Sequence, residues 1–514
     1  MQKESKAQRV ERIKAQMNPL DVIKDIYRYA ENGEIVDDET IDRLKWYGMY
    51  PHNKHSNDEN KSFYMLRVKL PCGKINLKQL EVLGDISERF AQNKADFTVR
   101  QDIQFHYIKF KDLPEIFEML ESSSLTTQMA SGDCPRNIVT CPLSGMSGDE
   151  IIDTREVFSQ LNEYFQANSE FINLPRKYKI GICGCKNRCI VHEIQDLSFV
   201  AFKDCDEIRF NVYIGGGLAS NKRFASLLGS VKENQIVKVA AGVATLFRDL
   251  GNRENRAKAR IGHLVESLGI LEFQKKLEEF LGFEIRKSTE LEKPSFLKRN
   301  HFGKTKSKDE KTSHIGFTTQ SGDVGGVGLR NISQSMRKYG VESIALTTTQ
   351  NFIAVDVPNE SIESFKKSLK EVGVTSKPSA FKVRALACTG LEFCKFAISE
   401  TKELQKSVIS HLENRFPDFD ESVSITFSGC PNSCVHSHIS DIGLIGAKVD
   451  SDSGFRLVLG AKMDNSEKEF AKKSKLKASS SDIHLLLEGL VEDYLKEKDK
   501  FGSFNEYLLT QSIT

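Results

Sequence analysis

The sequence predicts an α+β protein built from two related halves. KIGICGCKNRCIVHEIQDLSFVAF at 179–202 aligns without gaps with SITFSGCPNSCVHSHISDIGLIGA at 424–447, an offset of 245 residues. A weaker match pairs FTVRQDIQFHYIKF at 97–110 with LTTTQNFIAVDV at 346–357, an offset of 249 residues. Each half also runs in the same order: a module of alternating strands and helices, two cysteine-containing stretches, and then further strands and a helix. Together these observations indicate a duplication.

The composition is that of an ordinary globular chain. The 514 residues are 39% hydrophobic and 28% charged, with 73 Lys and Arg against 71 Asp and Glu. Such a length predicts roughly three to four domains, and the charge balance excludes a polycation that coats nucleic acid. The N-terminal MQKESKAQRVERIK lacks the apolar stretch of a signal peptide, and the longest apolar run, 239–247, is too short to span a bilayer. We therefore expect a soluble, cytoplasmic protein with no nucleic-acid partner and no membrane partner.

The cysteines are the unusual feature of the composition. There are 11, and in a reducing compartment they are better candidates for metal binding or redox chemistry than for disulfides. Cys72 and Cys205 stand alone, and the other nine form four short stretches. These stretches are Cys134 with Cys141, then Cys183, Cys185 and Cys189, then Cys388 with Cys394, and finally Cys430 with Cys434.

The last two cysteine pairs follow predicted strands. ACTGLEFCK and SGCPNSCVH each open after a β-prone run and contain Gly, which places them in strand-to-turn segments. Two such turns, once brought together, can surround one metal centre. Zinc usually takes closer pairs, whereas the five residues between Cys388 and Cys394 suit a larger iron–sulfur cluster. The spacing favours an iron–sulfur cluster and leaves zinc, or unligated buried cysteines, as alternatives.

Five motifs in order along the chain resemble those of a known enzyme family. TVRQDIQFH, GDCPRNIV, LPRKYK, CTGLEFC and SGCPNSC resemble the motifs of the ferredoxin-dependent sulfite and nitrite reductases, which contain siroheme and a 4Fe–4S cluster. The likeness extends to RVKLPCGKI near residue 67 and FRDLGNRENRAKAR at 247–260, so it covers nearly the whole chain. By this resemblance, the cluster ligands are Cys388, Cys394, Cys430 and Cys434. Cys434 would also bridge the cluster to the siroheme iron, which makes the two cofactors one electronic unit.

The resemblance also implies a cationic substrate pocket. Sulfite and nitrite are small oxyanions whose reduction consumes a proton for almost every electron, so the pocket needs fixed cations and proton donors. The residues to which the resemblance assigns these roles are Arg100, Arg136, Lys177 and Lys179. Lys179 favours sulfite over nitrite, because in this family sulfite reductases carry Lys where plant-type nitrite reductases carry Asn, and a dianion requires one more cation.

Siroheme is polyacidic, so the protein must neutralise its carboxylates. We expect part of RDLGNRENRAKAR to do this, with a solvated, charged helix face as the alternative. The residues expected to bind the cofactor in this way are Arg253, Arg256, Lys258 and Arg260, together with Gln104 and His106 of the TVRQDIQFH motif.

The resemblance predicts six-electron reduction of sulfite to sulfide, with electrons from reduced ferredoxin. The first alternative is a nitrite reductase that makes ammonia with the same machinery, or an enzyme that reduces both anions. A relative in the corrin pathway, which shares the ancestry without siroheme catalysis, is a second alternative, although the four pocket cations argue against it. A structural metal protein or an electron carrier is a third.

The implied fold is α+β with pseudo-two-fold symmetry. Two ferredoxin-like modules, 61–125 and 312–376, pair with each other, and two larger α+β domains, 126–285 and 377–514, hold siroheme and the cluster between them. Residues 1–60 form a helical extension. The Lys- and Ser-rich stretch 286–311 is the predicted linker, which its composition makes a mainly solvated connector.

The first-half cysteines depart from many relatives. Cys134, Cys141, Cys185 and Cys189 either hold a second cluster or are remnants of the duplication. Two differences favour remnants: Lys186 stands where the second half has Pro431, and six residues rather than five separate the first pair.

Overall fold

The computed structural model describes residues 4–33, 36–52, 63–148, 150–219, 221–291, 299–463 and 468–512. Residues 53–60 of the predicted extension and 292–298 of the predicted linker lie outside the described residues. The chain is mixed helix and sheet with a duplicated architecture, so the predicted α+β fold class is confirmed. None of the described helices is long and apolar enough to cross a bilayer.

The chain begins with helices that precede the first small module. Their bounds are α1 (Lys6–Gln16), α2 (Val22–Asn32) and α3 (Asp38–Arg43). Ser5 and Gln8 form a reciprocal capping box that satisfies the free backbone N–H groups at the start of α1. The extension also contributes a strand, β1 (Met49–Pro51), which pairs with β2 (Phe63–Val68).

Each half contains a small module of one sheet and two helices. The first sheet has the order β1-β2-β5-β4, and the second has β11-β12-β14-β13-β3. The remaining strands are β3 (Lys74–Asn76), β4 (Ala95–Phe97), β5 (Ile103–Lys109), β11 (Gly303–Lys306), β12 (Thr312–Phe317), β13 (Ser343–Leu346) and β14 (Phe352–Pro358). The helices are α4 (Leu77–Phe90), α5 (Leu113–Glu121), α10 (Gly325–Tyr339) and α11 (Ile362–Glu371).

The two small modules exchange strands. β3 belongs to the first half but pairs with β13 of the second half, and Gly322 and Val324 of the second half bond in turn to the backbone of β4. Helix α4 packs directly on α10, where a Cβ on Gly326 would lie 2.7 Å from the carbonyl oxygen of Gly84. One hydrophobic core therefore runs through both modules.

Two glutamines mark the symmetry of this exchange. The Gln101 side chain donates to the carbonyl of Leu346, and the Gln350 side chain donates to the carbonyl of Phe97. Both glutamines have a backbone φ of +59°, and both pairs of positions are 249 residues apart, the offset of the weaker sequence repeat. The repeat is thus a genuine pseudo-two-fold relation in space.

The larger domains repeat one sheet topology. In β10-β9-β8-β7-β6 and in β19-β18-β17-β16-β15, the three strands that come first in the chain are parallel, and the remaining two return antiparallel. The first set is β6 (Val139–Thr140), β7 (Ile180–Cys183), β8 (Leu197–Asp204), β9 (Glu207–Ile214) and β10 (Ser226–Val231). The second is β15 (Arg384–Ala387), β16 (Ser424–Ser428), β17 (Ile442–Val449), β18 (Asp452–Leu459) and β19 (Lys472–Ser479).

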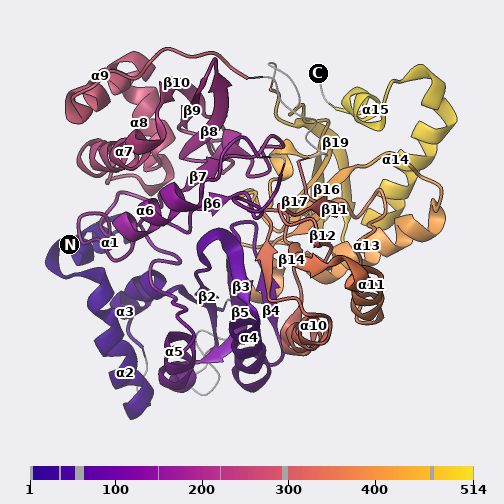
Figure 1. Ribbon diagram of the computed structural model, residues 1–514, viewed down its shortest axis with the longest axis horizontal. Coiled ribbons are helices and arrows are strands. Elements are labelled where there is room, and N and C mark those ends of the chain that lie inside the picture. Colours follow the sequence, from indigo (N-terminus) through magenta and orange to yellow (C-terminus); the bar gives the residue numbers. More distant parts are fainter. Residues whose placement is uncertain are drawn as a thin grey trace.

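Helices cover each of these sheets and close two separate cores. In the first domain they are α6 (Arg155–Phe165), α7 (Ile236–Leu250), α8 (Ile261–Leu268) and α9 (Ile270–Leu281). In the second they are α12 (Gly390–Phe393), α13 (Lys402–Arg415), α14 (Ile483–Glu497) and α15 (Phe504–Thr510). Figure 1 shows the two large domains at opposite sides of the molecule, with the strand-exchanged modules along its lower edge.

The described part of the predicted linker is mostly exposed or half-buried, but two parts of it are held to the protein. Arg299 is fully buried and its guanidinium lies 2.7 Å from Glu193 of the first large domain. Residues 303–306 form β11, which pairs with β12. At these two places the linker departs from the mainly solvated connector that the composition predicts, because a charged side chain can be buried where a carboxylate receives it.

Candidate active site

The second-half cysteines lie at the carboxyl ends of neighbouring parallel strands. Cys388 directly follows β15, Cys430 follows β16, and the two strands pair in register from Arg384 and Ser424 onward. Helix α12 then turns the chain to Cys394, whose N–H bonds to the carbonyl of Gly390. Because parallel strands end at one edge of a sheet, the fold places both cysteine turns beside each other.

The surroundings of these sulfurs fit an iron–sulfur cluster. The N–H of Gly429 donates to Cys388 Sγ at 3.1 Å, and backbone N–H groups also point at the sulfurs of Cys394 and Cys430. Burial raises the pKa of the Cys388 thiol to about 12, so it would become a thiolate only beside a cation such as iron. Cys434 is exposed, so it has the open side that a bridging ligand needs.

Two predicted pocket arginines are held by backbone carbonyls. The Arg100 guanidinium donates to Gln195 Oε1 at 2.9 Å and to the carbonyls of Asn137 and Ile180. Burial lowers the pKa of Arg100 to about 10, and its Nε is buried with no hydrogen-bond partner among the described residues. Arg136 is buried and donates twice to the carbonyl of Gly132, at 3.1 and 2.9 Å. Both cations are therefore fixed in place.

Lys177 and Lys179 extend this group of cations. They keep partial exposure, yet enough protein surrounds them that burial lowers the pKa of Lys177 to about 7, assisted by Arg260. Burial also lowers the pKa of Lys179 well below its ordinary range, with Lys177 and Arg100 as the next causes. The negative charge of Cys434 acts on Lys177 in the opposite direction. Lys177 of the first half is thus near enough to Cys434, the cysteine predicted to bridge the cofactors, for its pKa to depend on the charge of that cysteine.

Most of the residues expected to bind siroheme carboxylates already contact protein acids. Arg253 pairs with Glu11 at 2.7 Å. Arg256 makes a bidentate contact with Asp133 at 2.8 and 2.9 Å, and Arg260 contacts Asp196 at 2.9 and 2.7 Å. Lys258 is exposed. These contacts leave part of the guanidinium forks of Arg256 and Arg260 for another anion, whereas both terminal nitrogens of Arg253 are already occupied.

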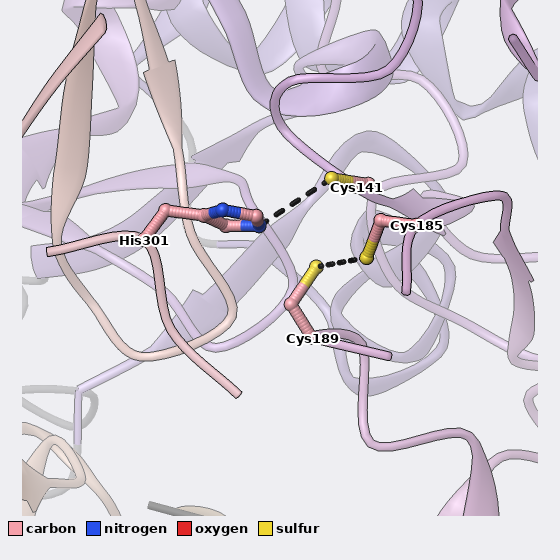
Figure 2. A group of neighbouring side chains, drawn as sticks. All are labelled: Cys141, Cys185, Cys189 and His301. Atoms are coloured by element: carbon pink, nitrogen blue, oxygen red, sulfur yellow. Dashed lines mark hydrogen bonds between the residues drawn. The ribbon is translucent and has the colours of Figure 1, made fainter. Parts of the chain in front are cut away.

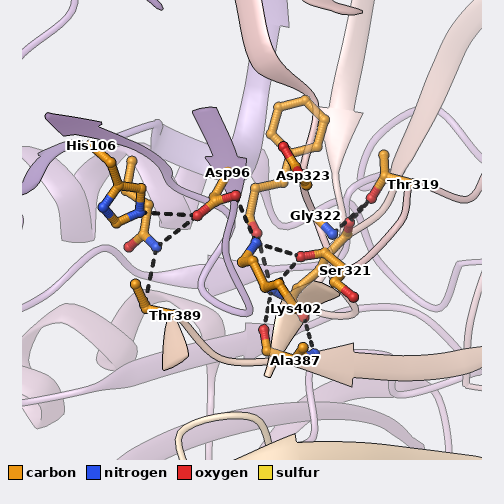
Figure 3. Close-up of polar contacts among 12 residues, drawn as sticks. Asp96, His106, Thr319, Ser321, Gly322, Asp323, Ala387, Thr389 and Lys402 are labelled. Carbon is orange, nitrogen blue, oxygen red and sulfur yellow. Dashed lines mark hydrogen bonds and ion pairs between the residues drawn. The ribbon is translucent and has the colours of Figure 1, made fainter. Parts of the chain in front are cut away.

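His106 belongs to a buried network with Asp96 and Lys402 (Figure 3), and Gln104 joins it through Asp96. Asp96 accepts hydrogen bonds from His106 at 3.1 Å and from Lys402 at 2.6 Å. Burial alone would raise the pKa of Asp96, but Lys402 and His106 outweigh it and hold this pKa well below its usual range. Gln104 lies 3.5 Å from Thr389 Oγ1. The His106 ring stacks on Phe393 at 3.8 Å. In this structure both residues support the cluster turn from the other half.

Sequence reasoning missed several residues near the cations. Burial, followed by Arg384, Lys179 and Arg100, lowers the pKa of His436 to about 3. Burial would raise the pKa of Tyr50, but Arg136 and Arg67 together bring it below its ordinary value. Arg67 was within reach of the sequence, since it opens the RVKLPCGKI motif. His436 was also within reach, since it ends the SGCPNSCVH stretch, whereas Tyr50 had no such signal because only the fold brings it to the site.

The first-half cysteines form a second, tighter group. The ligand atoms of Cys141, Cys185, Cys189 and His301 all lie within 4.8 Å of one another, and the three cysteines are buried (Figure 2). Cys183 lies beside the group, with its sulfur 3.6 Å from that of Cys185. Hydrogen bonds from Cys141, Cys183 and Cys189 lower the pKa of the Cys185 thiol well below its ordinary value.

The predicted second cluster set was wrong at Cys134. Cys134 precedes β6 and packs with Trp46, Met129 and Ile172, whereas Cys141 directly follows β6, as Cys388 follows β15. The similar number of residues between the cysteines suggested that Cys134 corresponds to Cys388. That comparison took no account of β6, which lies between Cys134 and Cys141.

The register of the two loops can be read from one glycine in each half. Gly184 accepts from the N–H groups of Ile151 and Ile152, and Gly429 accepts from those of Ile398 and Ser399 in the same way. A Cβ at Gly184 would lie 2.2 Å from the carbonyl oxygen of Ile152. The loops are therefore offset by 247 residues, which matches Cys141 with Cys388 and places Ser147 where the second half has Cys394.

The chain is thus a duplicated α+β protein with two cysteine-containing turns at one edge of a sheet and a group of buried cations, and its class is that of an oxidoreductase. Two family models match it: the nitrite and sulphite reductase 4Fe-4S domain at residues 131–285 and 380–506, and the nitrite/sulfite reductase ferredoxin-like half domain at 56–123 and 305–372. The chain therefore belongs to the nitrite and sulfite reductase family.

Relatives with curated names cover almost the whole chain. It is 30% identical to a sulfite reductase (ferredoxin) from Mycobacterium tuberculosis over 97% of this chain and 94% of that protein. It is 29% identical to a ferredoxin–nitrite reductase from Leptolyngbya laminosa over 90% of this chain and 92% of that protein. The solved structure of the Mycobacterium tuberculosis NirA protein matches with a TM-score of 0.90 at 29% identity, covering 97% of this chain and 95% of that one.

Proposed function

We propose that the protein reduces sulfite to sulfide with six electrons from reduced ferredoxin, using siroheme coupled to a 4Fe–4S cluster. The observation that carries the proposal is the meeting of the two halves: Lys177 responds to the charge of Cys434, and His436 responds to Lys179 and Arg100. A thiolate ligand and a set of fixed cations thus share one site. The curated relatives named sulfite reductase support the same substrate.

In this proposal, Cys388, Cys394, Cys430 and Cys434 hold the cluster, and Cys434 also ligates the siroheme iron. When bound, the two cofactors supply the electrons and the metal that binds the oxyanion. Arg100 and Arg136 hold the anionic oxygens through rigid guanidinium groups. The chain's remaining tasks are binding charge and delivering protons.

Lys177 and Lys179 are the proposed proton donors. Their lowered pKa values bring the ammonium groups toward the range in which a proton can leave near neutral pH. A bound oxyanion and the cofactor's carboxylates would raise these pKa values again, because a nearby negative charge favours the protonated form. Each lysine would then hold its proton while the anion is bound and release it as negative charge is consumed.

The siroheme carboxylates remain assigned to Arg253, Arg256, Lys258 and Arg260, now with Arg67 added. Gln104 and His106 are still proposed to bind the cofactor, and their hydrogen bonds to Asp96 position them. For Arg256 and Arg260, the support is the unused part of each guanidinium fork beside its protein carboxylate, whereas Arg253 is supported by its sequence motif alone. For Arg67 it is a buried Nε with no partner among the described residues.

The proposed docking place of the electron donor lies next to Cys394. Lys395 and Phe396 follow this ligand and are exposed, Phe396 by 60%. Lys6 and Lys45 of the N-terminal extension are close enough to Lys395 to lower its pKa, after burial. A small basic surface with one exposed aromatic ring fits an acidic donor such as ferredoxin, and it lies beside the cluster.

The absorption spectrum of the purified protein tests the proposal first. Strong visible siroheme bands that shift when sulfite is added support it, and their absence after expression with siroheme synthesis intact would overturn it. Steady-state turnover with reduced ferredoxin on sulfite and on nitrite then separates the substrates. A strong preference for nitrite would favour the second candidate, a nitrite reductase, which the relative named ferredoxin–nitrite reductase also supports.

A further inference from the structure

The geometry of the first-half cysteines points to a structural zinc site, with one Zn²⁺ bound by Cys141, Cys185, Cys189 and His301. This site is separate from the redox centre and does not depend on the proposed reaction. Its ligands come from two loops of the first large domain and from the start of the second half (Figure 2).

The distances between ligand atoms fit one tetrahedral ion. Zinc lies about 2.3 Å from a thiolate sulfur and about 2.0–2.1 Å from an imidazole nitrogen, so tetrahedral ligands stand about 3.8 Å apart for two sulfurs and about 3.5 Å for sulfur and nitrogen. In the structure, the sulfurs of Cys185 and Cys189 are 3.7 Å apart. Cys141 Sγ and His301 Nε2 are 3.4 Å apart. Three thiolates and one imidazole are also a common donor set for structural zinc.

The same fold provides an internal control for this geometry. In an iron–sulfur cubane each cysteine binds a different iron atom, so the whole cluster separates the sulfurs. Among the described residues, no three of Cys388, Cys394, Cys430 and Cys434 have sulfurs within 4.8 Å of one another. The equivalent first-half loops have closed to the spacing of a single ion. A second 4Fe–4S cluster would have to force them apart again.

His301 is positioned by backbone pairing rather than by chance approach. Two residues after it, β11 begins and pairs with β12, and Ser307 further along bridges to Ser147 of the first-half loop. His301 thereby replaces the ligand that the first half lacks, since Ser147 stands where Cys394 stands in the other half. The zinc ion would fasten the connection between the halves to the first large domain.

The site is reachable and its neighbours are distinguishable from its ligands. A cavity with about 140 Å³ of space that is not fully enclosed is lined by Cys141, Cys185 and His301, together with Lys186 and Asn187, so an ion can enter. Cys183 lies against Cys185, with its sulfur 3.6 Å away, and also interacts with Cys189, but it is outside the group of four. It therefore supports the ligand sulfurs without belonging to the set.

Metal analysis of the intact holoenzyme tests the site without any mutation. Zinc, iron and acid-labile sulfide are measured per siroheme in anaerobically purified protein. We expect one zinc per chain, and iron and sulfide for one cluster together with the siroheme iron. Absence of zinc overturns the proposal, and so does iron and sulfide sufficient for a second cluster.

Variants then identify the ligands. His301→Ala and Cys189→Ser are expected to lose zinc while siroheme and cluster absorption are retained, and the retained spectra show that the protein has folded. The matched controls, Cys134→Ser and Cys183→Ser, remove a buried thiol outside the site and should keep the full zinc content. Loss of zinc in either control, or its retention in His301→Ala, contradicts the assigned ligand set.

Cobalt provides a readout besides metal content. After exchange of zinc for Co²⁺, wild-type protein should show the intense ligand-field and sulfur charge-transfer bands of tetrahedral thiolate-bound cobalt, measured as a difference spectrum against the zinc form. Weak bands typical of six-coordinate cobalt would overturn the tetrahedral site. The His301→Ala variant should lack the tetrahedral spectrum.

Discussion

In the second half, Cys388 and Cys430 follow parallel strands, and their sulfurs stand apart with backbone N–H groups aimed at them. In the first half, Cys141 and Cys185 follow the equivalent strands, yet their loops close around one point together with His301. At the ligand position of Cys394 the first half has Ser147, and His301 is the fourth member of its group. Loss of one cysteine from a duplicated site thus changes which metal the remaining cysteines can bind, while the fold is kept.

The halves differ in charge as well as in metal. Lys179 stands where the second half has Ser424, and in both halves the residue's backbone N–H bonds to an aspartate, Asp196 or Asp441, at 2.9 and 2.8 Å. Arg260 contacts Asp196, as Asn505 contacts Asp441. One half therefore provides the cations of the site and the other provides the thiolates, which a duplicated scaffold allows because each half can change without unfolding the other.

The largest expected effect is the difference in activity and cofactor content between substitution of Cys434 and substitution of its equivalent, Cys189. Cys434→Ser should lower sulfite turnover by about 1,000-fold or more and disturb both the siroheme and the cluster spectrum, since it removes the thiolate shared by the two cofactors. Cys189→Ser should leave both spectra in place and lose zinc. If the two variants show the same cofactor loss, the halves do not divide the metals as described. Absorption spectra and turnover with reduced ferredoxin measure both outcomes.

Arg260→Asn copies the second-half residue into the first half. Asp196 is fully buried, so removal of its cation should cost roughly 3 kcal/mol of unfolding free energy. Burial raises the pKa of Asp441 in the second half, where no arginine stands at the equivalent position. A second change, Asp196→Asn, should restore most of the loss. Urea titration followed by circular dichroism checks this, and an unaltered midpoint in the single variant would refute the proposed dependence.

Lys179→Asn removes a cation that the second half does not have. We expect the ratio of turnover on sulfite to turnover on nitrite to fall by about tenfold, equivalent to roughly 1.4 kcal/mol, because the dianion loses more Coulomb stabilisation than the monoanion. Siroheme and cluster content should stay at the wild-type level, which serves as the control. An unchanged ratio would remove Lys179 as the residue that selects sulfite.

The smallest effect concerns the pH dependence of stability. In the cofactor-free structure the pKa of Lys177 is about 7, below the ordinary 10.5, so the folded state binds fewer protons than the unfolded state between these values and stability rises with pH across that window. Lys177→Met removes the cost of charging this buried amine. Thermal unfolding of siroheme-free protein should show a gain of several degrees at pH 6 and a smaller gain at pH 9. Equal gains would mean that Lys177 is not the titrating group.

Much of the fold could be predicted because the two repeats are gap-free and long. The offset of 245 residues places Cys185 on Cys430, and Gly215 and Gly460 at the same distance both bond to the repeated aspartate carbonyls. The strand exchange could not be predicted, since β3 has three residues and no pattern that names its partner. Only the packing of α4 on α10 brings it to β13.

The cysteine register and the zinc ligand His301 show where sequence reasoning ended. The six residues between Cys134 and Cys141 are close in number to the five between Cys388 and Cys394. The spacing alone does not reveal that Cys134 lies before a strand and Cys141 after it. His301 lies in a Lys- and Ser-rich stretch, where a single histidine has no local signal. By contrast, Arg100 and Lys179 lie in recognisable motifs, and the structure brings both to the cation group.

The exchange between the two small modules also affects how the chain folds during synthesis. The first small module is complete in sequence by about residue 125, but the edge of its sheet waits for Gly322 and Val324, which are synthesised roughly 200 residues later. At roughly 5–20 residues per second, that delay is roughly 10–40 s on the ribosome. During this time β4 presents an unpaired edge beside an apolar face, which other nascent chains can join. We therefore expect chaperones to bind the chain while its second half is being synthesised. The cofactors are expected to bind only after the chain has left the ribosome.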